Sequence, residues 1–197
     1  MQFLKKSPQN TTQILIQRET QGKFLYFNFY LIDNFARKKK IFMTESWQSY
    51  SDMNWWPSLI WLNETKFITI GFYSDIEQSL PQSEGLFSIV QIDLNDFSKE
   101  ILYTDLEIKP FPKFVLNPSL TDLYFQKAGK QSDSTELWKL DLAEKNAEMI
   151  YSVQGDLGEI RFSSDGSSFV FTQLLANNFD IIRIDLDRNH IRQLVGK

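Results

Sequence analysis

The sequence predicts an all-β protein built from about four copies of a four-stranded unit, and three observations support this. Short apolar runs rich in β-branched and aromatic residues alternate with segments of Asn, Asp, Gly and Ser. No segment carries a sustained apolar stripe with helical spacing, so we expect essentially no helix. One pattern recurs at intervals of about 45 residues, which is typical of a β-propeller blade. The predicted fold is therefore a β-propeller, or a propeller-like arc, of about four antiparallel blades.

The repeat is clearest in the predicted third strands, where an apolar run ends in Asp-Leu. Such runs occupy residues 89–94, 137–142 and 181–186, and their Asp residues are 48 and 44 positions apart. Each run follows a predicted hairpin and precedes a polar turn and another apolar run. We expect one domain over 1–197, with blades at 14–45, 57–105, 112–153 and 158–195.

The first blade is the weakest copy of the repeat. Its first strand is predicted at 14–16, followed by strands at 24–27, 30–32 and 41–43. Aligning the predicted first strands of all four blades places these positions in register: Ile16, Leu62, Leu116 and Phe162.

The last blade also carries a family resemblance. Residues 159–171 read EIRFSSDGSSFVF, residues 180–186 read DIIRIDL, and residues 192–194 read RQL. This segment resembles the TolB-like propeller repeat, which is similar to the WD-type blade and usually carries aromatic-Ser-Pro-Asp-Gly between its first two strands. Ser164 stands where that repeat has Pro. The 113–151 copy keeps Asn117-Pro118, the 57–103 copy keeps Pro57-Ser58, and the first copy departs furthest.

The resemblance implies a blade fold and leaves the number of blades open. Propellers with this repeat commonly have six or seven blades, whereas this chain has room for about four. The chain is then a closed four-blade ring, a part of a longer propeller, or an open arc that completes itself by self-association through blade edges.

Composition excludes several chemistries. The 197 residues include no Cys and one His, which excludes disulfides, thiol catalysis and Cys- or multi-His metal sites. The net charge of −4 argues against general nucleic-acid binding. We expect no cofactor, no nucleic-acid partner and no membrane insertion. The N-terminal residues lack the apolar core of a secretory signal. This predicts a cytoplasmic protein if the chain is complete, and a periplasmic or secreted one if it is a fragment of a longer TolB-like protein.

The strand order predicts which loops share an end of the blades. Short turns join strands 1 and 2 and strands 3 and 4 at one end. At the other end lie the long loops 73–85 and 126–136 and the aromatic-rich link 46–56, which we call the long-loop face. Aromatic residues and Met are enriched at binding hot spots. The predicted binding residues are Trp47, Tyr50, Met53, Trp55, Trp56, Asp75 and Glu77. The alternative role is blade packing, which is favoured for Trp56 and Trp61 and equally weighted for Trp47 and Trp55.

Other polar residues are weighed against structural roles. Asp33, Asp93, Asp141 and Asp185 follow the third strands once per repeat, which favours turn hydrogen bonding over a carboxylate ring for metal or acid–base chemistry. His190 lacks the Gly-x-Ser-x-Gly elbow of a hydrolase. The basic run 37–40 is interpreted as a solvated hairpin turn rather than an anion-binding surface.

We therefore expect a non-enzymatic binding or scaffold module that recognises a protein or peptide through the long-loop face. One alternative is a propeller subunit or fragment accessory to a peptidase or glycosidase, and the glycosidase version needs paired carboxylates such as Asp75 and Glu77. Another is a purely structural, self-assembling subunit, a homo-oligomer formed through blade edges.

Overall fold

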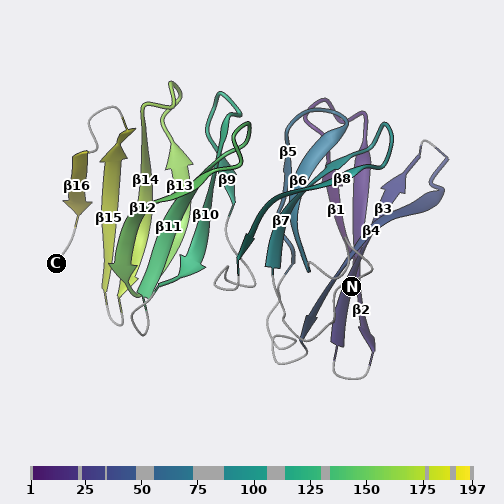
Figure 1. Cartoon of the computed structure of the whole chain (residues 1–197), viewed down its shortest axis with the longest axis horizontal. Helices are drawn as coiled ribbons and strands as arrows, with labels where there is room; N and C mark the ends of the chain where they lie inside the picture. The colour runs from purple at the N-terminus through teal and green to yellow at the C-terminus, as the bar shows by residue number, and fades with distance from the viewer. Residues whose placement is uncertain are drawn as a thin grey trace. The chain divides into compact units, whose positions relative to one another are not determined.

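The computed structural model describes residues 2–21, 24–33, 35–47, 56–72, 87–105, 114–129, 134–175, 178–186 and 190–195. Over these ranges the chain forms strands β1 to β16 in four antiparallel sheets and no α-helix (Figure 1). In every sheet the strands lie side by side in sequence order. This is the four-stranded meander expected for propeller blades.

The strand bounds define the four sheets. The first sheet contains β1 (Gln2–Lys6), β2 (Gln13–Gln21), β3 (Phe24–Ile32) and β4 (Lys38–Trp47). The second contains β5 (Leu59–Trp61), β6 (Lys66–Phe72), β7 (Phe87–Asp93) and β8 (Lys99–Asp105). The third contains β9 (Val115–Leu116), β10 (Asp122–Ala128), β11 (Ser134–Asp141) and β12 (Ala147–Gln154). The fourth contains β13 (Asp156–Phe162), β14 (Ser168–Leu175), β15 (Asn178–Asp185) and β16 (His190–Val195).

The first sheet differs from its prediction. It begins at Gln2 instead of residue 14, so Ile16 lies in the second strand and not in the first. The runs at 24–27 and 30–32 form one continuous strand, β3. Strand β1 was missed because its sequence, QFLKK, is largely exposed and shows little of the apolar alternation that marks a half-buried strand.

A repeated hydrogen bond fixes the equivalence of the sheets. In the first, third and fourth sheets, the turn between the first two strands is closed by a backbone N–H that bonds to a carbonyl five residues later. These bonds are Ser7 N to Thr12 O (2.9 Å), Asn117 N to Asp122 O (3.0 Å) and Ser163 N to Ser168 O (2.9 Å). The turn at 7–12 therefore corresponds to the turns at 117–122 and 163–168.

The fourth residue of each of these turns has a left-handed backbone. Its φ is 60° at Asn10, 59° at Leu120 and 73° at Gly166. Asn and Gly tolerate this region, whereas Leu adopts it at a cost. The predicted Asp-Gly signature of the last blade thus marks a backbone position that the first and third sheets also contain.

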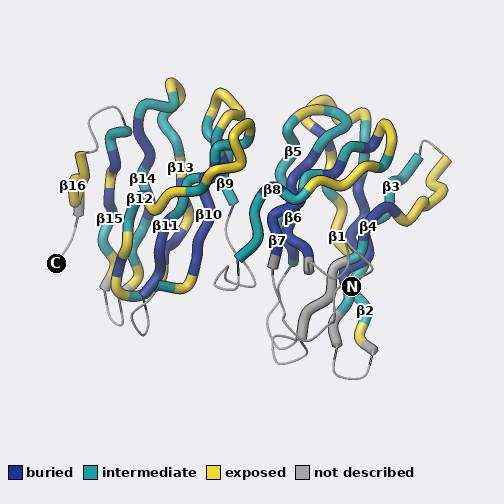
Figure 2. Tube along the Cα trace, in the orientation of Figure 1, coloured by how far each residue is buried: buried dark blue, intermediate teal, exposed yellow. Residues whose placement is uncertain are grey.

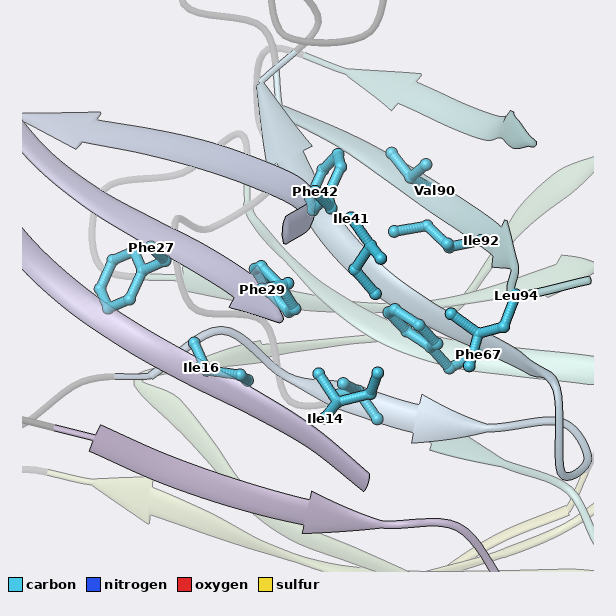
Figure 3. Close-up of a cluster of buried hydrophobic side chains, with 11 residues drawn as sticks. Ile14, Ile16, Phe27, Phe29, Ile41, Phe42, Phe67, Val90, Ile92 and Leu94 are labelled. Carbon is cyan, nitrogen blue, oxygen red and sulfur yellow. The ribbon is translucent and has the colours of Figure 1, made fainter. Parts of the chain in front are cut away.

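The chain divides into two compact units, Met1–Leu106 and Glu107–Lys197, each with two sheets. In the first unit, side chains of β2, β3 and β4 pack against β6 and β7 (Figure 3). Phe29 lies at the centre, with its ring 5.3 Å from Phe42 and 6.4 Å from Phe67. In the second unit, Tyr124 of the third sheet meets Phe162 and Phe169 of the fourth, at 5.1 and 5.3 Å. Aromatic side chains therefore fill the space between neighbouring sheets within each unit.

Candidate functional site

The two ends of the first sheet carry different connections. Lys6, Gln13, Ile32 and Lys38 form one row of paired residues across the sheet, next to its two short turns. At the opposite end Phe24 pairs with Trp47, where β4 leads into the 46–56 link. The short turns and the long-loop face therefore lie at opposite ends of the first sheet, as predicted.

The repeated Asp residues serve the short turns. Asp33 accepts backbone N–H bonds from Phe35 and Arg37 at 2.9 and 2.8 Å. Asp93 accepts one from Asn95, and Asp141 accepts two from Ala143 and Glu144, all at 2.9 Å. The turn interpretation is confirmed for these three carboxylates.

The same hydrogen bonds set the pKa values of these carboxyl groups. The backbone N–H of Arg37 contributes most to lowering the pKa of Asp33, and the N–H groups of Asn95 and Glu144 do so for Asp93 and Asp141. A carboxyl group whose charged form is stabilised in this way is a poor proton donor near neutral pH. These residues are therefore structural acceptors and not candidates for general acid catalysis.

The fourth repeated Asp has a different partner. Asp185 accepts a bond from Arg183 Nε at 2.6 Å, and its cross-strand partner is His190, which is exposed at the start of β16. The turn residues 187–189 lie outside the described residues. Among the described residues no group of three or more His, Asp or Glu side chains could hold a metal ion.

A glutamate joins the short turns of the first two sheets. Glu64, in the turn between β5 and β6, accepts hydrogen bonds from the hydroxyls of Ser7 and Thr11 and from the Gln9 N–H at 2.7 Å. Desolvation raises the pKa of Glu64, but these hydrogen bonds outweigh it and the net pKa is lowered. Neighbouring sheets in this unit are thus fixed at their short-turn ends as well as through their core.

The basic run 37–40 is exposed at the second short turn of the first sheet and the start of β4. Arg37 pairs with Asp33 at 2.6 Å and lies over the ring of Phe35, which is 81% exposed. Lys39 Nζ lies 3.4 Å from the ring centroid of Phe97, in the corresponding turn of the second sheet. The run is a solvated hairpin turn held by one carboxylate and by aromatic rings.

The predicted binding residues divide into three groups. Trp47 is the last residue of β4, at the long-loop face. Trp56 is half-buried against the first core, with its ring 5.7 Å from Phe3 and 5.9 Å from Phe27. The others, Tyr50, Met53, Trp55, Asp75 and Glu77, lie outside the described residues. Trp56 and Trp61 both pack on this core, as their favoured structural role required.

The predicted loop 126–136 is shorter in the structure. Gln126 and Glu136 lie inside β10 and β11, because those strands extend to Ala128 and begin at Ser134. Both are buried, and Gln126 Nε2 donates to the carbonyl of Leu157 in the fourth sheet at 3.1 Å. Gln126 therefore links the third and fourth sheets instead of lying in a loop.

Buried charged residues lie on β10 and β11 next to this connection. Lys127 Nζ lies 4.2 Å from the ring centroid of Trp138, and Trp138 Nε1 donates to Glu136 Oε2 at 2.9 Å. Lys127 and Glu136 are also cross-strand partners. Two opposite charges joined through one indole form a compensated cluster, which is typical of a structural role.

Comparison with solved structures identifies the fold of this chain. No family model matches the sequence, and no curated protein matches it. A structure described as TolB from Agrobacterium tumefaciens superimposes with a TM-score of 0.60 and 14% identity, over 97% of this chain and 63% of that chain. The chain has a TolB-like β-propeller fold. It spans less than two thirds of the length of that TolB structure.

Two further propeller matches come from enzymes. A puromycin-hydrolyzing peptidase from Mycobacterium tuberculosis gives a TM-score of 0.60 at 12% identity, over 98% of this chain and 28% of that chain. An oligogalacturonate lyase in complex with manganese gives 0.52 at 12% identity, over 100% and 73%. Because TolB and these enzymes share the fold, the fold does not by itself decide between an enzyme and a binding protein.

One feature of the fourth sheet was not anticipated. Arg161, Arg183 and Arg192 lie in one row across it, with Val170 between the first two. The available signal was the alternation in 179–185, where Phe179, Ile181 and Arg183 share one face of β15.

No described helix is long and apolar enough to span a membrane.

Proposed function

We propose that this chain is a non-enzymatic propeller module that binds a protein or peptide through the long-loop face. The observation that carries the proposal is the anchoring of the 46–56 link at both ends. Trp47 ends a ten-residue strand, and Trp56 is held between Phe3 and Phe27 before β5 begins. A link with Trp, Tyr and Met between two fixed points offers hot-spot residues on a rigid support.

The polar residues at the short-turn end already have structural roles in the turns, and this supports the same proposal. Its carboxylates accept backbone N–H bonds, and its arginine at position 37 pairs with Asp33. Side chains committed to turns have little capacity left for substrate chemistry. Recognition is therefore assigned to the opposite end, where the link from β4 to β5 and the connection from β6 to β7 are longer than any of the short turns.

The experiment uses peptides selected from a displayed random library on the 197-residue chain. Affinities are then measured for the natural sequence and for a Trp47→Ala, Trp55→Ala double variant. We expect the double variant to lose about tenfold or more in affinity, with a melting temperature close to that of the parent. The matched control is Phe35→Ala, which removes an exposed aromatic ring at the short-turn end and leaves the affinity unchanged.

Three results would overturn the proposal. The first is recovery of no binding peptide. The second is a double variant that binds as tightly as the parent, or a Phe35→Ala variant that loses binding instead. The third is cleavage of the selected peptides by the purified chain, which would favour the hydrolase alternative.

A further inference from the structure

The outer face of the fourth sheet exposes apolar residues at positions that are buried elsewhere. Phe179 stands six residues before Asp185, as Phe27 stands six residues before Asp33. In the same way Ile181 corresponds to Phe29, since each stands four residues before its Asp. Phe27 and Phe29 are fully buried because the second sheet covers them, whereas Phe179 is 56% exposed. The fourth sheet thus has the side-chain pattern of a covered blade on a face that no described segment of its own unit covers.

Three rows of paired residues make up this face, which we call the outer face. The first row contains the arginines Arg161, Arg183 and Arg192 together with Val170. The second contains Thr172, Ile181 and Val195, and the third contains Asp156, Leu174 and Phe179. The first row lies toward the short turns and the third toward the long-loop face. Strand β16 at the edge of the sheet is exposed over 190–194 (Figure 2).

The arginines on this face are partly neutralised by neighbouring carboxylates. Arg161 pairs with Glu159 at 2.8 Å and Arg183 with Asp185 at 2.6 Å. The face therefore combines apolar side chains with ion pairs that are already formed. Such a surface can be covered by a neutral or self-complementary partner while Arg161 and Arg183 keep their carboxylate partners.

A second copy could cover this face in two ways, and charge disfavours one of them. In a head-to-tail contact the first sheet of one copy would cover the fourth sheet of another. The outward side of the first sheet carries Lys6, Lys38 and Lys40 next to its short turns. Neighbouring sheets keep their short turns at the same level, so three lysines would face the arginine row.

A two-fold contact between outer faces avoids this repulsion. The two-fold axis of such a contact lies in the interface, perpendicular to the strands and along the second row. Each strand then packs against the same strand of the second copy, which runs in the opposite direction. Ile181 then faces Ile181 of the second copy, and Val170 faces Leu174. Arg183 faces Phe179, which is a favourable cation–π arrangement.

We propose that the outer face of β13 to β16 is a two-fold homodimer interface of this kind. A sheet with strands of about seven residues offers a flat face of about 450 Å² per protomer. A dimer therefore buries about 900 Å² of total surface, without the extra area that protruding side chains add, and this is at the low end for specific interfaces. We expect a weak dimer with a Kd on the order of 10 μM. The interface is independent of the long-loop face.

Sedimentation velocity of the full chain over a concentration series tests the dimer. The expected result is a shift from 23.2 kDa toward twice that mass as concentration rises. Phe179→Arg is expected to weaken association about tenfold or more, because it replaces the apolar ring with a guanidinium that faces Arg183 of the second copy. Phe35→Arg, at another exposed aromatic position, is the control and leaves association unchanged.

Cysteine cross-linking tests the geometry, since the natural chain contains no Cys. Under mild oxidation, Ile181→Cys is expected to give a disulfide-linked dimer faster than the exposed control Phe35→Cys. Tyr30 pairs with Lys40 and so lies on the outward side of the first sheet. Mixing Ile181→Cys with Tyr30→Cys chains therefore reports on head-to-tail contact. A monomer at every concentration, equal cross-linking of Ile181→Cys and Phe35→Cys, or preferential mixed disulfides with Tyr30→Cys would each overturn the proposal. Circular dichroism of each variant verifies that it is folded.

Discussion

Replacement of Gly166 by Ala tests whether the turns between first and second strands are one repeated structure. Gly166 has a φ of 73°, a region that L-residues enter at a cost of about 1–2 kcal/mol. Alanine also restricts the unfolded chain, which offsets about 0.4–1 kcal/mol of that cost. The added Cβ would lie 3.1 Å from Pro118 Cδ in the neighbouring turn, so the proline ring must shift slightly. The strain less this offset leaves up to about 1.6 kcal/mol, and the shift of the proline ring adds to it, so we expect a net destabilisation of about 1 kcal/mol.

The reverse change at the equivalent position is the matched control. Leu120 is exposed and has a φ of 59° in the third sheet. Leu120→Gly relieves about 1–2 kcal/mol of backbone strain, and the added freedom of the unfolded chain offsets about 0.4–1 kcal/mol of that gain, so stability should be unchanged or raised by up to about 1 kcal/mol.

Urea unfolding followed by circular dichroism measures both variants, with the shift expected in the transition of the unit 107–197. The reasoning is refuted if Gly166→Ala is as stable as the parent. It is also refuted if Leu120→Gly destabilises the protein as much as Gly166→Ala does.

Three further predictions concern acid stability and packing. The pKa of Asp165 is lowered to about 2 by hydrogen bonds from Ser163 and Ser167, and those of Asp33, Asp93 and Asp141 are also lowered. The hydrogen bonds to these carboxylates therefore give their full stabilisation above the unfolded-state pKa of about 4, and that stabilisation is lost as pH falls toward 2. The melting temperature should hold from neutral pH to about 5 and then drop, and the drop should be less steep in the Asp165→Asn variant. Trp56→Ala should destabilise the first unit by about 2 kcal/mol in urea unfolding, about half the value for a fully buried Trp, and an unchanged stability would contradict its packing role. Tyr124→Ala should cost the second unit about 3–5 kcal/mol because it empties a site between two aromatic rings, and a loss below about 1 kcal/mol would contradict that core.

The blades that could be predicted from sequence are those whose strands alternate apolar and polar residues and whose turns carry a recognisable residue pattern such as Asp-Gly. The fourth sheet matches its predicted span closely, because Asp165-Gly166 and the 181–186 run mark its turn and its third strand. The first sheet was misplaced because β1 is exposed and lysine-rich, so it lacks the buried face that produces alternation. The pair Ser7-Pro8 was the remaining signal, since it stands where the family repeat has Ser-Pro.

The candidate site was only partly predictable for a related reason. Sequence alone cannot show whether a Trp beside a strand start faces a partner or a core. Trp56 contacts Phe3 and Phe27, which are far from it in sequence. Gln126 and Glu136 looked like loop residues because they are polar, yet they are buried in strands. The arginine row became visible only once strand register placed Arg161, Arg183 and Arg192 side by side.

Amide hydrogen exchange with and without a selected peptide tests the central claim most directly. A propeller module that binds through its long-loop face should gain protection in segments 46–56 and 73–85 when the peptide is present. The turns at 7–12, 117–122 and 163–168 should exchange at the same rate in both samples. Protection of those turns, with the 46–56 and 73–85 segments unchanged, would contradict the account.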